Sequence, residues 1–259
     1  MKKHKMKKSV GIFAMLAVAI GLLAFSSIGG ARAALTIYSQ TYESEMKMKH
    51  IGITLLENGE PVSHRNYSGN NTWDEKQNGE LLTGIDEFEF GKKYEEVLTV
   101  KNTGSTEDPG AIDEYVILTI RKYWVDEDGN KRTDLDPGLI KVHLTEDPHW
   151  IRDVANSSDE TERIVMIYDT PLKPGEETVA ATDTITVDSA IKAVVETIDT
   201  IEEDGMTVII TTYSYDGLKF VLEAEAEGVQ THNAVDAIHS AWGRKVKIDP
   251  VTKQITAIE

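Results

Sequence analysis

Apolar and polar residues alternate along much of this chain, and the alternation is strongest at residues 114–125. One face of this stretch would carry a row of apolar side chains: Val116, Leu118, Ile120 and Trp124. The other face would carry Tyr115, Ile117 and Tyr123 among polar residues. A strand with apolar side chains on both faces is buried on both sides, so the pattern predicts a central strand.

Shorter apolar or alternating runs bounded by turn residues predict further strands. They lie at residues 51–56, 94–101, 140–144, 164–168, 179–187, 206–215 and 218–229. In the last run apolar residues from Leu218 to Ala226 alternate with Lys219 and three glutamates, which predicts one face in the core and one in water. Asp216-Gly217 separates the last two runs and predicts a hairpin that pairs them.

Three other segments do not show the pattern of a strand clearly. Residues 66–79 are rich in Asn, Gly and Ser and predict a long surface loop. Helical spacing occurs at residues 233–242, with Thr231 or Asn233 as the cap and Gly243 as the stop. Residues 191–201 are ambiguous between helix and strand. The pattern as a whole predicts an all-β sandwich with one or two short helices.

The N-terminal residues have the order of an export signal. Five lysines among the first eight residues precede an acid-free apolar run at residues 10–28, which leads to Ala31-Arg32-Ala33. This order predicts a signal peptide over residues 1–33, cleaved between Ala33 and Ala34. The alternative is a retained membrane anchor, because the run approaches the roughly 20 residues that span a bilayer. The small residues before the cut favour cleavage.

Charge limits the partners of the exported part, which we expect to be a single domain over residues 34–259. The chain has 27 Lys+Arg and 44 Asp+Glu, for a net charge of −17, and residues 1–33 hold six of the bases and no acid. Such an acidic surface repels phosphates and anionic lipids, so we predict no nucleic acid partner and no stable membrane anchor after cleavage. Because cysteine is absent, the fold must rely on apolar burial and sheet hydrogen bonds.

Three polar residues near the C-terminus invite a metal interpretation: His232, Asp236 and His239. On a helix, residues seven apart are separated by roughly 10 Å, which is too far for two imidazoles to bind one zinc ion. His232 and Asp236 alone would be half a site. A solvated helix face is the simpler interpretation.

Two acidic patterns also have simple interpretations. Asp126-Glu-Asp128-Gly129-Asn130 resembles the start of a calcium loop but lacks the closing glutamate, which favours a hairpin turn. Glu223, Glu225 and Glu227 would lie about 7 Å apart on one strand face, a spacing that suits an acid and base pair but is commoner in an exposed charge stripe. No zincin, hydrolase, phosphate-loop or dinucleotide motif occurs. We therefore predict no catalytic, cofactor or metal residues, and calcium binding stays open.

Three segments resemble the TasA/camelysin-like family of exported proteins. They are the signal at residues 12–33, the Ile-Gly-Ile-Thr-Leu-Leu-Glu-Asn-Gly segment at residues 51–59, and the acidic tail at residues 223–243 that ends in Ser-Ala-Trp-Gly. The resemblance implies processing by a SipW-type signal peptidase and export from a Gram-positive bacterium. It also implies a jelly-roll-like sandwich that assembles into biofilm matrix fibres, with an accessory matrix protein as a candidate partner. Camelysin-like members are classed as cell-surface metalloproteases, which is the alternative function.

A freed N-terminal strand has physical consequences of its own. Cleavage would expose an alternating segment within residues 34–56, and unpaired strands are templates for another chain. We expect Leu35 and Ile37 to fill pockets on a neighbouring copy, which gives a head-to-tail homopolymer when the contact does not close into a ring. The alternatives are pairing of this strand within its own domain, and an adhesin that clusters through bound cations.

Overall fold

The computed structural model describes Met15 and most of the chain from His50 to Glu259. The described ranges are 50–67, 73–77, 81–83, 85, 88–107, 110–155, 157, 162–193, 195–203, 206–213, 215 and 217–259. Contacts divide the chain into Met1–Met46 and Lys47–Glu259. Everything described below belongs to the second of these units, which is all-β with antiparallel sheets and one α-helix in its described part.

The first layer is built on strand β6 (Glu114–Val125), whose bounds match the predicted central strand. The sheet has the order β14-β6-β10-β9, and β7 also pairs with β6. The bounds of the other strands are β7 (Lys131–Arg132), β9 (Trp150–Arg152), β10 (Arg163–Tyr168) and β14 (Lys219–Gln230). Both faces of β6 are buried, as the alternation predicts, because apolar side chains cover each side.

The second layer combines two sheets, of order β3-β2-β1-β5 and β4-β11-β8. The strands are β1 (Ile51–Glu57), β2 (Glu60–Tyr67), β3 (Trp73–Gln77), β4 (Tyr94–Glu95), β5 (Leu98–Asn102), β8 (Ile140–Leu144) and β11 (Thr182–Val187). The segment before β11 joins them, since Ala181 N donates to Leu98 O and Thr178 N donates to Val100 O, both at 2.8 Å.

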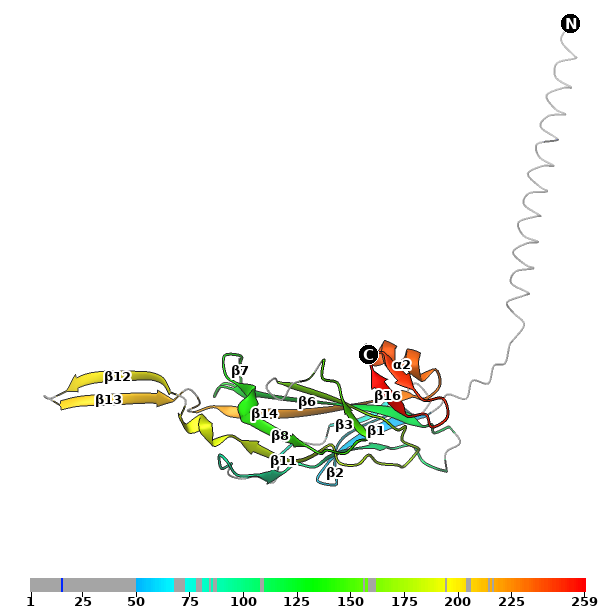
Figure 1. The fold of residues 1–259 in the computed structure, drawn as a ribbon, viewed down its shortest axis with the longest axis horizontal. Coiled ribbons are helices and arrows are strands. Elements are labelled where there is room, and N and C mark those ends of the chain that lie inside the picture. Colours follow the sequence, from blue (N-terminus) through cyan, green and yellow to red (C-terminus); the bar gives the residue numbers. More distant parts are fainter. Residues whose placement is uncertain are drawn as a thin grey trace, which may run out of the picture. The chain divides into compact units, whose positions relative to one another are not determined.

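The main core lies between these two layers, which run along each other in Figure 1. Its fully buried members include Leu98, Val100, Leu118, Ile120 and Ile185. Burial of one such side chain contributes about 1.5–3 kcal/mol, so this shared core holds the two layers together.

A second core covers the outer face of β6 at one end. There helix α2 (Ala234–Trp242) and the hairpin of β15 (Val246–Ile248) and β16 (Ile255–Ile258) pack on the sheet. The predicted helix is confirmed, and Gly243 ends it with a φ of 68°. Among the apolar residues of this helix, Ile238 and Trp242 are buried, whereas Val235 is 47% exposed. Asn233 makes no side-chain cap, because its backbone is itself left-handed.

The hairpin predicted at Asp216-Gly217 is wrong. Strand β13 (Met206–Tyr213) pairs with β12 (Val195–Glu203), and β14 pairs with β6 over twelve residues. The turn signal is real, since Gly217 has a φ of 70°. The long pairing with β6 prevails because it buries the apolar face of β14, which a local hairpin would not do. Residues 189–193 form a short 3-10 helix and β12 follows, which settles the ambiguous segment.

The loop predicted at residues 66–79 is also wrong in part, because β2 continues to Tyr67 and β3 pairs with it. Charged pairs link the two strands: Arg65 Nε lies 2.6 Å from Glu75 Oε1, and His64 Nε2 lies 3.3 Å from Asp74 Oδ2. Such polar cross-strand pairs stabilise an edge hairpin without any apolar alternation, so a hydrophobic pattern does not reveal them.

We expect Gly52→Ala to destabilise the fold by about 1–3 kcal/mol, as overpacking does in a filled interior. A Cβ at this position would overlap Asn66 Oδ1 and Thr103 Oγ1. Urea unfolding followed by tryptophan fluorescence measures the loss. An unchanged unfolding midpoint would contradict the close packing of β1 on these side chains.

Candidate functional site

Strand β14 has one edge without a strand partner. It pairs with β6 from Lys219 opposite Val125 to Gln230 opposite Glu114, and the sheet order ends there. Within the described ranges no other strand pairs with β14. A free edge of this length presents unpaired main-chain groups that another strand can use.

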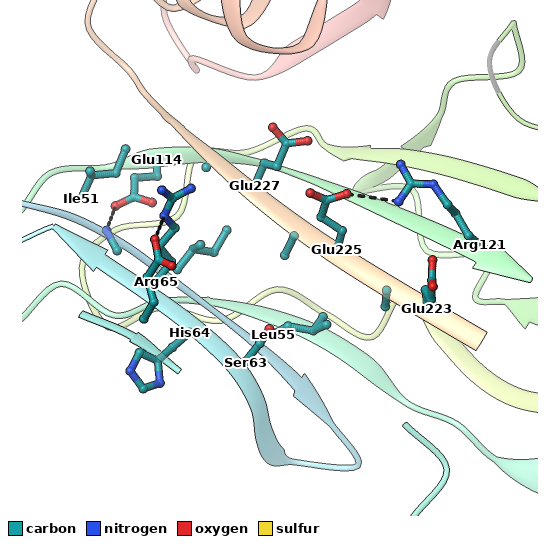
Figure 2. A pocket seen from close by; sticks show the side chains of 16 residues that line it. Ile51, Leu55, Ser63, His64, Arg65, Glu114, Arg121, Glu223, Glu225 and Glu227 are labelled. Carbon is teal, nitrogen blue, oxygen red and sulfur yellow. Dashed lines mark hydrogen bonds and ion pairs between the residues drawn. The ribbon is translucent and has the colours of Figure 1, made fainter. Parts of the chain in front are cut away.

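A groove of about 600 Å³ runs beside this edge, between β14 and strands β1 and β2 (Figure 2). Its apolar lining comes from Ile51, Ile53 and Leu55 of β1 and from Ala224 and Ala226 of β14. The groove therefore combines a free strand edge with an apolar floor, which is what a strand with alternating side chains needs.

Small residues of β14 create this space. Three successive core-facing positions hold Ala224, Ala226 and Gly228, and all three are only half-buried. Leu222, one position earlier on the same face, is 8% exposed. The core is thus closed at Leu222 and more open over Ala224 and Ala226, which leaves room there for apolar side chains from another segment. At Gly228 the space is filled by Glu114 Oε2 and Ile53 Cδ1.

The rim of the groove is polar and internally paired. Arg121 Nη1 lies 3.2 Å from Glu225 Oε2. Tyr123 donates its hydroxyl to Glu223 Oε1 at 2.7 Å, and this bond raises the pKa of Tyr123 to about 12. Glu223 and Glu225 are exposed and bound to partners across the strand pair, as expected for a charge stripe.

Glu114 lies at the end of the groove near Gly228. Its side chain is fully buried, and Oε1 accepts a hydrogen bond from Gly52 N at 3.0 Å. Oε2 has no hydrogen-bond partner among the described residues. Burial raises the pKa of Glu114 to about 8, although the Gly52 amide opposes the shift. Glu114 is therefore mainly a neutral acid at pH 7.

A second buried acid lies outside this groove. Glu96 is fully buried, and neither of its carboxyl oxygens has a hydrogen-bond partner among the described residues. Burial and the neighbouring Glu57 carboxylate raise the pKa of Glu96 to about 9. Two buried carboxylates in contact share one proton more readily than they both ionise.

The metal candidates from the sequence do not converge. Among the described residues no group of three or more His, Asp or Glu side chains is placed to hold a metal ion. The turn at residues 126–130 is a hairpin turn, as predicted, in which Asn130 N donates to Asp126 Oδ1 at 2.8 Å. The Asp126 carboxylate is thus used within the turn.

The signal-cleavage residues Ala31, Ala33 and Ala34 and the donor residues Leu35 and Ile37 lie outside the described residues. Among the residues that are described, no helix is long and apolar enough to cross a bilayer. The groove and the two buried acids were not found from the sequence. The signal that could have found the groove is the run of small residues at alternate positions of β14.

No family model matches the chain. No curated protein and no solved structure matches it either.

We predict that stability falls as pH rises from 5 to 9. Unfolded glutamates lose their protons near pH 4.5, whereas Glu114 and Glu96 keep theirs in the fold until about pH 8 and 9. This contribution is fully present below pH 4.5 and is lost as pH rises through the two folded-state pKa values, at about 1.4 kcal/mol per pH unit for each retained proton. Urea unfolding at pH 5, 7 and 9 measures it.

The variant Glu96→Gln should lose less stability between pH 5 and 9 than wild type, because the amide cannot ionise and only the contribution of Glu114 is left. The matched control is Glu95→Gln, which changes an exposed neighbour and should keep the wild-type slope. Stability that stays constant or rises between pH 5 and 9 would argue against buried neutral acids.

Proposed function

We propose that this protein is an exported structural subunit that forms extracellular fibres by donating its N-terminal strand to the groove beside β14 of the next copy. The observation that supports this most directly is the free edge of β14 above Ala224, Ala226 and Gly228. An open edge and an open core at the same place are what a missing strand would leave.

The proposed donor has matching chemistry. Residues 34–40 alternate, with Leu35 and Ile37 two positions apart. A seven-residue strand spans about 23 Å, which is shorter than the twelve residues of β14 at about 3.3 Å each. Side chains two positions apart in an added strand fall on the same face. Leu35 and Ile37 would thus both enter the space above the small residues.

The N-terminal strand would make the same contacts whether it enters the groove of another copy or the groove of its own copy. Residues 41–49 could reach about 30 Å when extended, so the strand could also fold back on its own domain. In the proposed arrangement the strand enters a different copy, and repetition of that contact gives a head-to-tail polymer. The same proposal includes a jelly-roll arrangement of the two layers and removal of residues 1–33 by a signal peptidase.

Electron microscopy and sedimentation of two forms of the chain would test strand donation. The form that starts at Ala34 should assemble into fibres, whereas the form that starts at Thr41 lacks the donor and should stay monomeric. Equal fibre formation by both forms would refute the proposal. A mature chain that remains monomeric at high concentration would also refute it.

Filling the groove gives an independent prediction. We expect Ala226→Phe to raise the concentration needed for assembly by at least about tenfold, because the new ring occupies the space meant for the donor side chain, and tenfold corresponds to only about 1.4 kcal/mol. The control is Ala226→Ser, which adds little volume and should assemble like wild type. Sedimentation velocity measures assembly. Normal fibres from Ala226→Phe would exclude this groove as the acceptor.

A further inference from the structure

Glu114 occupies a position that the alternation of β6 assigns to the core. Side chains of the same face at Val116, Leu118 and Ile120 are fully buried in the main core. Glu114 continues this row by one position toward the groove, and it is the only charged-type residue lining the groove that is fully buried within the described part. An acid at the end of an apolar row is costly to bury without a partner.

One oxygen of the Glu114 carboxyl group has a hydrogen-bond partner, and the other has none among the described residues. Oε1 accepts the Gly52 N–H, whereas Oε2 has no hydrogen-bond partner in the described ranges (Figure 2). A Cβ added to Gly228 would lie only 2.7 Å from Oε2, so the Glu114 carboxyl group packs against β14 at a position where only a glycine fits. The unsatisfied oxygen therefore lies beside the strand edge that the proposed donor would join.

Two ion pairs lie at the groove. From β2, Arg65 pairs with Glu75 of β3, and from β6, Arg121 pairs with Glu225 of β14. The remaining titratable residues that line it are His64, Glu223 and Glu227. Burial raises the pKa of Glu114 by more than the hydrogen bond from the Gly52 amide lowers it, which is consistent with a neutral acid.

We propose that Glu114, as a neutral carboxylic acid, donates its O–H to a main-chain carbonyl of the strand that enters the groove. The protonated carboxyl group has one donor, and Oε1 is already used as an acceptor, so the free oxygen is the donor. The edge of an incoming strand presents main-chain carbonyls at regular intervals. Glu114 would then be the polar anchor of the interface, and this inference rests on the strand donation proposed above.

The anchor makes assembly depend on pH in a defined direction. Only the protonated form can donate, so the apparent affinity scales with the protonated fraction of Glu114. With a pKa of about 8, that fraction falls about tenfold between pH 7 and pH 9. An incoming ammonium group paired with an ionised Glu114 would produce the opposite trend.

The test compares the mature chain from Ala34 with its Glu114→Gln variant by sedimentation at pH 7, 8 and 9. The apparent affinity of wild-type assembly should fall about tenfold between pH 7 and pH 9. Glutamine keeps an acceptor for Gly52 and a neutral N–H donor, so Glu114→Gln should assemble at pH 7 like wild type and hardly change up to pH 9. The control Glu95→Gln removes an exposed carboxyl group outside the groove and should follow wild type.

Near-ultraviolet circular dichroism at pH 9 checks that every form remains folded. Glu96 is present in all forms, so its ionisation affects them equally. Identical pH profiles for wild type and Glu114→Gln would overturn the role of Glu114 and leave strand donation standing. Loss of assembly by Glu114→Gln at pH 7 would overturn it too, because the negative charge would then be required. A wild-type chain that is monomeric at every pH would overturn strand donation, and the anchor with it.

Discussion

The pairing of β14 with β6 is the constraint on which the rest of the structure depends. Twelve residue pairs align the two strands, and β6 is buried on both faces. One face closes the main core against the second layer, and the other supports α2 and the C-terminal hairpin. Because β6 is packed on both faces, its pairing fixes the position of β14, although the other edge of β14 has no strand partner in the described part. A strand edge that is already positioned needs less ordering on binding than a flexible one would.

The periodicity of apolar residues is sufficient to predict a strand where the strand is buried on both faces or alternates strictly between core and solvent. The bounds of β6 and β8 and the core-facing row of β14 could be predicted because each depends on local sequence alone. The partner with which each strand pairs could not be predicted in this way. The turn at Gly217 is a local signal, yet the partner of β14 lies about a hundred residues away in β6. The hairpin of β2 and β3 was missed because its charged pairs carry no hydrophobic period.

The candidate site was harder to predict for a related physical reason. Ala224, Ala226 and Gly228 read as ordinary strand residues, and only the neighbouring strand β1 turns their small size into a groove. Glu114 is the first residue of the predicted central strand, but nothing in the local pattern indicates that the fold buries its carboxyl group completely. Both features arise from distant segments brought together, which a linear pattern does not contain.

The opposite border of the same sheet is strand β9, which has only three residues. One border is therefore long and the other is too short to seat a guest strand. Given strand donation at the long border, each subunit would contribute one acceptor edge and one donor strand of this sheet. Filaments built this way would be unbranched and polar, with chemically different tips, so that elongation and capping would be controlled separately at each tip.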